Sequence, residues 1–171
     1  MQTVSLKKVD SILTNRHLHL YSLYFLSFLI PFLLKGPQLL TGTLVNFLLI
    51  VGISQFKLKE IFPILLIPSL TAYLGQALLG NFTSHLLYLI PFISLSNLIF
   101  VVTYKNLRNP LYNLFLPALL KSLLLFTITY ILVRTISLPN IFLTTMGLIQ
   151  FTTAILGTLL AMMTIKASSD I

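Results

Sequence analysis

The chain has 171 residues and is strongly apolar, with 57% hydrophobic residues, 8% charged residues and a mean hydropathy of +0.98. Soluble domains carry about 25% charged residues, so this composition predicts an integral membrane protein with one transmembrane domain over residues 1–171. The formal net charge of +8 does not indicate nucleic-acid binding, because the basic residues form no stripe or cluster. The sequence has no cysteine, which excludes disulfides, iron–sulfur clusters and thiol nucleophiles.

The hydropathy pattern predicts an all-α bundle of six transmembrane helices, preceded by a polar head over residues 1–17. Asn109 and Pro110 have the residue types of an N-cap and a first helical position, and Glu60 suits the positive end of the third helix. Gly80-Asn81 resembles a C-terminal cap, so residues 81–85 are expected to form a loop. The expected spans cover residues 19–34, 38–55, 60–80, 86–104, 111–134 and 141–165.

The distribution of Lys and Arg predicts the orientation of the bundle. With the N-terminus in the cytoplasm, eight basic residues fall on the inner side, namely Lys7, Lys8, Arg16, Lys57, Lys59, Lys105, Arg108 and Lys166. Only Lys35 and Arg134 then fall in outer loops, whereas the reverse orientation violates the positive-inside rule. We therefore expect a multi-pass protein of the cell membrane with both termini in the cytoplasm.

Lys121 lies near the middle of the fifth expected span. A charge at bilayer depth is unfavourable by roughly 2.5–3.5 kcal/mol on insertion scales, and such residues usually face a bundle interior or a cavity. Each end of this helix is about 10 residues away, or ~15 Å, which is too far for the side chain to reach the interface comfortably. The three carboxylate side chains of the sequence, Asp10, Glu60 and Asp170, lie outside the spans or at their ends. Lys121 is therefore expected to be neutral, to be solvated by carbonyls and water, or to await an anion from outside the chain.

Other polar residues fall inside the expected spans. Asn46, Asn97 and Gln150 lie near the midplane by helix rise, and Gln76 lies in the outer half of its span. Such amides could join neighbouring helices, at about 0.6 kcal/mol each, or converge with Lys121 into a pocket for an anionic or hydrogen-bonding ligand. The candidate substrate-binding residues are Lys121, Asn97, Gln150, Asn46, Gln76 and Thr43.

The sixth expected span carries small and polar residues at helical spacing. This stripe consists of Gly147, Gln150, Thr153, Ala154, Gly157 and Ala161. Small residues let helices approach closely, so Gly147, Gly157 and Ala161 are candidates for helix packing or for binding a partner helix.

The sequence predicts that the protein is not an enzyme and uses neither a cofactor nor a metal. No expected span contains an internal carboxylate, which metal-dependent or acid–base chemistry would need. The histidines lie at helix ends, away from any serine at matching depth. No GxxxxGK[ST] phosphate loop occurs, so the chain has no route to ATP hydrolysis through that motif.

Five short segments carry a resemblance to a known family. They are PQLLTGTLVN at Pro37–Asn46, the pair Pro68-Ser69, PFISLSN at Pro91–Asn97, LLKSLLLF at Leu119–Phe126 and QFTTAILG at Gln150–Gly157. Together they resemble a family of small bacterial membrane proteins that is similar to the substrate-binding S components of energy-coupling factor transporters. The resemblance covers residues 20–165.

The resemblance implies six helices with cytoplasmic termini, and a pocket toward the outer half for a vitamin, a nucleobase-like compound or a metal ion. It also implies a lid over Lys35–Thr41, and a separate transmembrane scaffold subunit and ATPases that drive transport. The first span departs from many S components, because it has Ser22 and Ser27 in place of the Ala-x-x-x-Ala pair that docks to the scaffold.

Three functions remain open from the sequence. The first is a substrate-capture subunit of a multi-component importer, in which Lys121 pairs with the anionic part of a small solute from the outer side, aided by Asn97 and Gln150. The second is a membrane scaffold or assembly protein that binds a partner helix through the face of Gly157 and Ala161. The third, a self-sufficient carrier, is disfavoured because no internal carboxylate provides a proton or sodium relay.

Overall fold

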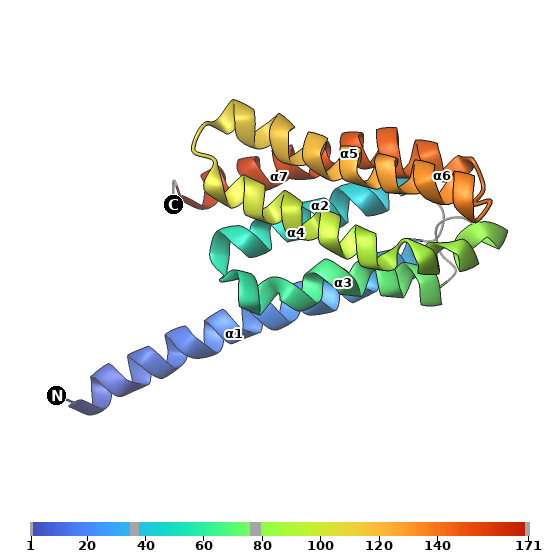
Figure 1. Cartoon of the computed structure of the whole chain (residues 1–171). Helices are drawn as coiled ribbons and strands as arrows, with labels where there is room; N and C mark the ends of the chain where they lie inside the picture. The colour runs from blue at the N-terminus through green and yellow to red at the C-terminus, as the bar shows by residue number, and fades with distance from the viewer. Residues whose placement is uncertain (1, 35–37, 76–79, 170–171) are drawn as a thin grey trace.

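The computed structural model of the chain describes residues 2–34, 38–75 and 80–169, and this part is helical throughout, without strands (Figure 1). The helices follow one another through short connections, as the apolar runs predict. They are α1 (Gln2–Leu33), α2 (Gln38–Gln55), α3 (Leu58–Leu74), the 3₁₀ helix η1 (Gly80–Tyr88), α4 (Ile90–Asn106), α5 (Pro110–Thr135), α6 (Ile141–Thr144), the π-helical stretch η2 (Thr145–Ile149) and α7 (Gln150–Ser169).

Three stretches of the described chain are long and apolar enough to cross a membrane: Gln38–Gln55, Pro110–Thr135 and Ile141–Ala167. A fourth is reached if the bent pair Phe82–Tyr88 and Ile90–Asn106 forms one broken span. The outside of the bundle is itself apolar, and Phe25 and Met163, for example, are 61% and 63% exposed. A large exposed apolar surface is typical of a protein that is solvated by lipid. These features are consistent with an α-helical membrane protein. Within the described residues, three to four helices meet the criterion of length and hydropathy, rather than the six that the sequence predicted.

The predicted helix ends are confirmed at α5 and are wrong at α3. The Asn109 side chain caps α5 by accepting a hydrogen bond from the backbone N–H of Leu111 at 2.9 Å, and Pro110 opens the helix. Helix α3 ends at Leu74, and Gly75 is its C-cap. The expected loop at residues 81–85 is instead part of η1, which lies at 64° to α4. Polar residues and a glycine in a sequence do not distinguish a loop from such a short 3₁₀ helix.

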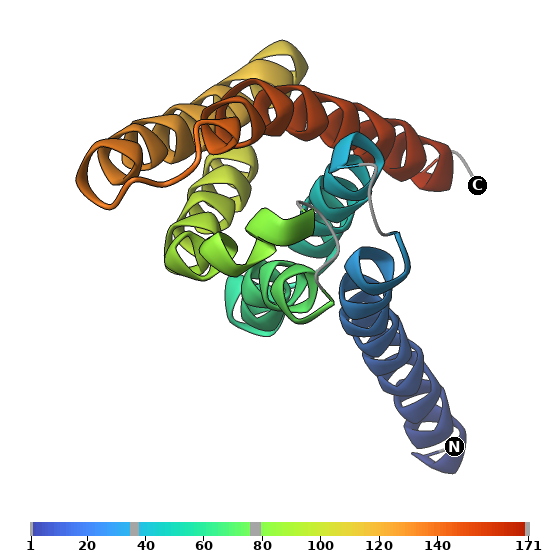
Figure 2. The same cartoon turned by 90° about the vertical axis from the view of Figure 1, so that its right-hand side faces the viewer.

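Helix α2 occupies the interior of the bundle. Viewed from its end, it lies between α7 on one side and α3 and α4 on the other, with α1 beside it (Figure 2). The larger apolar core follows α2, where Leu49 and Ile50 are fully buried, and a smaller core surrounds Phe142. The start of α1 and the end of α7 lie at the same end of the bundle (Figure 1).

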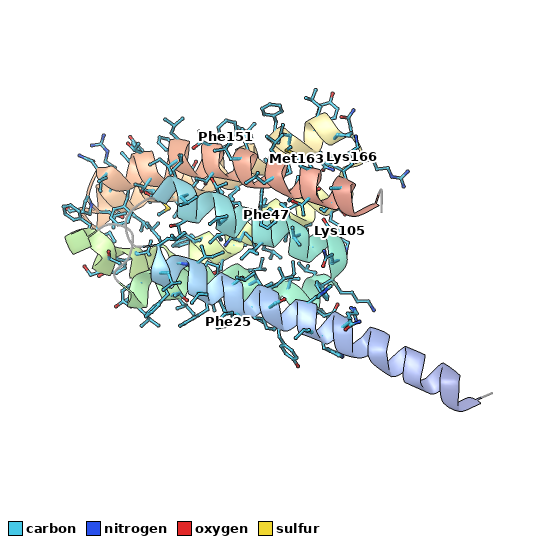
Figure 3. The ribbon with its side chains drawn as sticks, turned by 180° about the vertical axis from the view of Figure 1, so that it is seen from behind. Phe25, Phe47, Lys105, Phe151, Met163 and Lys166 are labelled. Atoms are coloured by element: carbon cyan, nitrogen blue, oxygen red, sulfur yellow. The ribbon has the colours of Figure 1, made fainter. Side chains whose placement is uncertain are left out.

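The expected polar head is helical, because α1 begins at Gln2 and its first half projects beyond the other helices (Figure 1). Where α1 joins the bundle, Nη2 of Arg16 lies 2.7 and 2.9 Å from the two carboxylate oxygens of Glu60, in the first turn of α3. Figure 3 shows Lys105 and Lys166 toward this same end and Phe25 on the outward side of α1. Basic residues thus gather at the end of the bundle that carries the start of α1 and the end of α7.

Candidate functional site

Lys121 is buried in the middle of α5, where its side chain is 2% exposed. Its Nζ atom donates a hydrogen bond to Oδ1 of Asn46 on α2 at 2.6 Å, and it lies 5.1 Å from the centre of the Phe100 ring on α4. An ammonium group has three donors, and a ring face attracts a cation without accepting a full hydrogen bond. The described contacts therefore solvate Lys121 in part but supply no opposite charge.

Asn46 connects three helices through its two amide atoms. Its Oδ1 accepts the hydrogen bond from Lys121, and its Nδ2 donates to Oγ1 of Thr153 on α7 at 3.2 Å. The Thr153 hydroxyl in turn donates to the backbone carbonyl of Gln150 at 3.2 Å. Because Nδ2 can only donate, these contacts fix which atom of the Asn46 amide faces Lys121. The expected role of this amide in joining helices and its place beside Lys121 are thus both observed.

Asn97 presents an unused acceptor. Its Nδ2 donates to the Leu65 carbonyl on α3 at 2.9 Å, whereas its buried Oδ1 has no hydrogen-bond partner in the structure. The residue is 2% exposed, and a buried acceptor without a donor is unfavourable by about 1–3 kcal/mol. Such a group calls for a donor from water or from a ligand.

A cavity of about 70 Å³ joins these side chains. Four of the predicted residues line it, namely Asn46, Asn97, Lys121 and Gln150. The other lining residues are Pro31, Gln38, Thr41, Gly42, Val45, Pro68, Ser69, Ala72, Leu86, Ile93 and Met146. These come from every long helix of the bundle, and Lys121 is the only residue among them that carries an ionisable side chain.

Two of the predicted site residues are not placed at the cavity. Thr43 does not line it: its hydroxyl donates to the Leu39 carbonyl within α2, and its backbone oxygen faces α7. Gln76 lies outside the described residues. Of the expected lid Lys35–Thr41, residues 35–37 also lie outside them, while Gln38 and Thr41 form part of α2 and line the cavity.

Sequence reasoning missed several lining residues. Gln38 and Thr41, near the start of α2, belong to the lid segment that the resemblance implied, but they were not among the predicted substrate-binding residues. Ser69 appears in the sequence analysis only in the pair Pro68-Ser69 that carries the resemblance, and it was not among the predicted site residues. The signal that could have found it is the buried stripe of Ser69 and Ala72, three residues apart on α3.

The small-residue stripe of the last span is divided by η2. Gly157 and Ala161 face α2 within the same chain, and a Cβ atom at Gly157 would lie 2.6 Å from the Thr43 backbone oxygen. Gly147 does not share that face: its nearest side chain is Phe126 on α5, 2.9 Å from the corresponding Cβ position. A π-helical turn contains more residues than an α turn, so regular helical spacing puts Gly147 on the wrong side.

The described lining of the cavity combines amide and hydroxyl groups with one amine. Among the described residues, no group of three His, Asp or Glu side chains could hold a metal ion. The prediction that the protein is not an enzyme and needs no cofactor is not tested by this observation. No family model matches the chain, and neither a curated protein nor a solved structure shows detectable similarity to it. The site itself therefore carries the functional argument.

Proposed function

We propose that the protein is a membrane-embedded substrate-binding subunit of a multi-component importer, comparable to an S component, which captures a small anionic or polar solute. The observation that carries this proposal is Lys121, a buried amine at a polar cavity whose described lining contains no carboxylate. A cation at membrane depth without an anionic partner is unfavourable, so such residues are retained where function needs them. An anionic solute would supply the missing charge and accept the remaining N–H donors.

The position of the cavity supports entry from the outer side. Its lining includes Pro31 and Ala72 near the ends of α1 and α3, Gln38 at the start of α2, and Met146 in η2. All of these lie toward the end of the bundle opposite the start of α1 and the end of α7 (Figure 1). We take the end with the start of α1 and the end of α7 as cytoplasmic, because it carries basic residues. Since both termini then lie on the same side, we infer an even number of crossings.

Transport would require partners that this chain does not provide. We infer a transmembrane scaffold subunit and separately encoded ATPases, because the sequence has no phosphate loop. The alternative of a scaffold protein that binds a partner helix through Gly157 and Ala161 gains no support, since both residues pack against α2. Helix α7 would have to separate from α2 before this face could bind another protein.

The test is native mass spectrometry of the detergent-purified protein. We expect a small-molecule adduct on the wild type and on Lys105→Met, a matched variant that removes an exposed amine at the end of α4. The adduct should be missing from Lys121→Met, because the methionine keeps the length of the side chain but not its donors. An adduct retained by folded Lys121→Met would contradict the proposed binding role of Lys121.

A further inference from the structure

The charge of the cavity at Lys121 limits the charge of its ligand. Among the described residues that line the cavity, only Lys121 has an ionisable side chain. Its Nζ uses one of three donors for Oδ1 of Asn46, and the Phe100 ring attracts the amine without neutralising it. A monovalent anion would balance this single charge, whereas an anion of higher charge would leave an unpaired charge inside the protein.

The volume of the cavity limits the size of the ligand. At about 70 Å³, it has about half the volume of an engineered cavity of about 150 Å³ that holds benzene. Benzene has six carbon atoms, so this cavity encloses about three non-hydrogen atoms at the same density. Vitamins and nucleobases, which the resemblance implied, are therefore too large to be fully enclosed. A metal cation is disfavoured as well, because it would carry a second positive charge next to Lys121.

The rest of the lining suits a small anion. Gln38 and Gln150 line the same cavity, and the amide group of each can donate hydrogen bonds. Apolar side chains, among them Pro31, Val45 and Ile93, form much of the remaining wall. In such surroundings the attraction between an anion and the amine is weakened less than it is in water.

Resting on the proposed binding function, we propose that the ligand is a monovalent anion of at most about three non-hydrogen atoms, scaled from the benzene cavity. Formate, nitrite and the halide ions belong to this class, and they share the charge and the size that the cavity selects. The anion would accept hydrogen bonds from the donors of Lys121 that Asn46 leaves unused.

The small size of the ligand limits its affinity. The highest binding free energy per non-hydrogen atom known for tiny ligands corresponds to a dissociation constant of about 0.5 mM for three atoms. A probe concentration of about 100 mM therefore lies roughly 100-fold above a dissociation constant of about 1 mM, and mass action then stabilises the folded state measurably.

The experiment is thermal unfolding of the full chain in detergent, followed by loss of the folded peak in size-exclusion chromatography. Sodium gluconate is the reference salt, because its anion is too large for the cavity, and sodium formate or sodium nitrite replaces it at constant ionic strength. We expect about 100 mM formate or nitrite to raise the midpoint of unfolding by at least about 3 °C.

Two further probes separate charge from size. Formamide has as many non-hydrogen atoms as formate but no charge, and propionate keeps the carboxylate but adds two carbon atoms. At about 100 mM, each should change the midpoint of unfolding by less than about 1 °C, since neither meets both limits of the cavity. These comparisons use the wild type alone and depend on no variant.

A pair of variants assigns the effect to its residue. Lys121→Met removes the amine, so formate should change its midpoint of unfolding by less than about 1 °C. Lys105→Met, which removes an exposed amine at the end of α4, should keep the full effect of formate. Each variant is compared with itself in gluconate, so a change in its basal stability does not affect the result.

Several outcomes would overturn the inference. Stabilisation by formamide equal to that by formate would refute the role of charge, and equal stabilisation by propionate would refute the size limit. An absence of stabilisation by formate or by nitrite would refute the ligand class, and so would a full effect of formate on Lys121→Met. The proposed function is judged separately, because a Lys121-dependent adduct of a larger or neutral molecule in native mass spectrometry would preserve it while the small-anion assignment fails.

Discussion

At the scale of single residues, the buried amine of Lys121 depends on one amide oxygen. The distance from Nζ of Lys121 to Oδ1 of Asn46 is 2.6 Å, which is short for a nitrogen–oxygen hydrogen bond. Asn46 is itself 1% exposed and donates a hydrogen bond to Thr153. Water therefore has little access to take its place as the acceptor for Lys121. Removing this oxygen should therefore lower the stability of the protein, because a buried donor is left without an acceptor.

The energetic coupling of Lys121 and Asn46 can be measured by a double-mutant cycle. We expect Asn46→Leu to lower the free energy of unfolding by about 1–3 kcal/mol in the wild type, because Lys121 loses its hydrogen-bonded partner. In a Lys121→Met background the same substitution should be at least about 0.5 kcal/mol less destabilising, since no amine is left unpaired. Unfolding in increasing SDS, followed by circular dichroism, gives both values.

A control for this cycle is Asn106→Ala, which lies at the exposed end of α4 and shares no partner with Asn46. Its effect should add to that of Asn46→Leu within about 0.5 kcal/mol. Full additivity of Asn46→Leu and Lys121→Met would show that the two side chains do not interact energetically, and it would contradict the structural assignment.

At the scale of elements, the close packing of α2 on α7 forms one wall of the cavity. Asn46 on α2 bonds to Thr153 on α7, and one turn later Gly157 lets the two backbones approach. In membranes, helix association relies on such small residues and on polar contacts, because lipid tails are as apolar as leucine. Small and polar residues thus alternate along the same helix–helix contact.

The two glycine substitutions Gly157→Ala and Gly52→Ala are expected to differ in their effect on stability. Gly157→Ala would place a Cβ atom 2.6 Å from the Thr43 backbone oxygen and 2.7 Å from the Phe47 backbone nitrogen, so the helices must separate. We expect it to destabilise the protein by about 1–3 kcal/mol, as overpacking does. Gly52→Ala meets the side chains of Ile61 at 3.3 Å and Ile64 at 3.8 Å, and no backbone atom is among its nearest contacts. It should stay within about 0.5 kcal/mol of the wild type, as substitutions do that need only a small side-chain adjustment. Thermal unfolding in one detergent compares them, and equal stability of the two variants would be inconsistent with the close approach.

The sequence predicted the elements better than it predicted which residues face one another. The long apolar runs and the Asn109 cap identified α5 to within one residue at each end, because these signals are local. Polar residues inside apolar spans must turn inward, which is why Asn46, Asn97, Lys121 and Gln150 reach one cavity. Thr43 does not line this cavity, and Gly147 does not share the face of Gly157. An error of one position rotates a side chain by about 100°, and the π-helical turn of η2 cannot be read from residue types.

At the scale of the whole molecule, orientation follows from charge that is separated along the bundle axis. Lys105 and Lys166 lie toward the end that carries the start of α1 and the end of α7 (Figures 1 and 3). Arg16 pairs there with Glu60 in the first turn of α3, whereas Arg134, in the last turn of α5, lies at the opposite end. The cavity lies toward that opposite end. If the basic end is cytoplasmic, as the positive-inside rule predicts, the cavity lies toward the outer side of the membrane.

This topology can be tested by cysteine labelling, because the natural sequence contains no cysteine and gives no background. We expect Asn140→Cys, in the exposed connection between α5 and α6, to react with a membrane-impermeant maleimide in intact cells. Asn106→Cys, at the exposed end of α4, should react only after the cells are permeabilised. Each variant serves as the control for the other, since both residues are exposed and differ only in the side of the membrane. The reverse pattern would place the cavity toward the cytoplasm and would rule out capture of a solute from outside, whatever Lys121 binds.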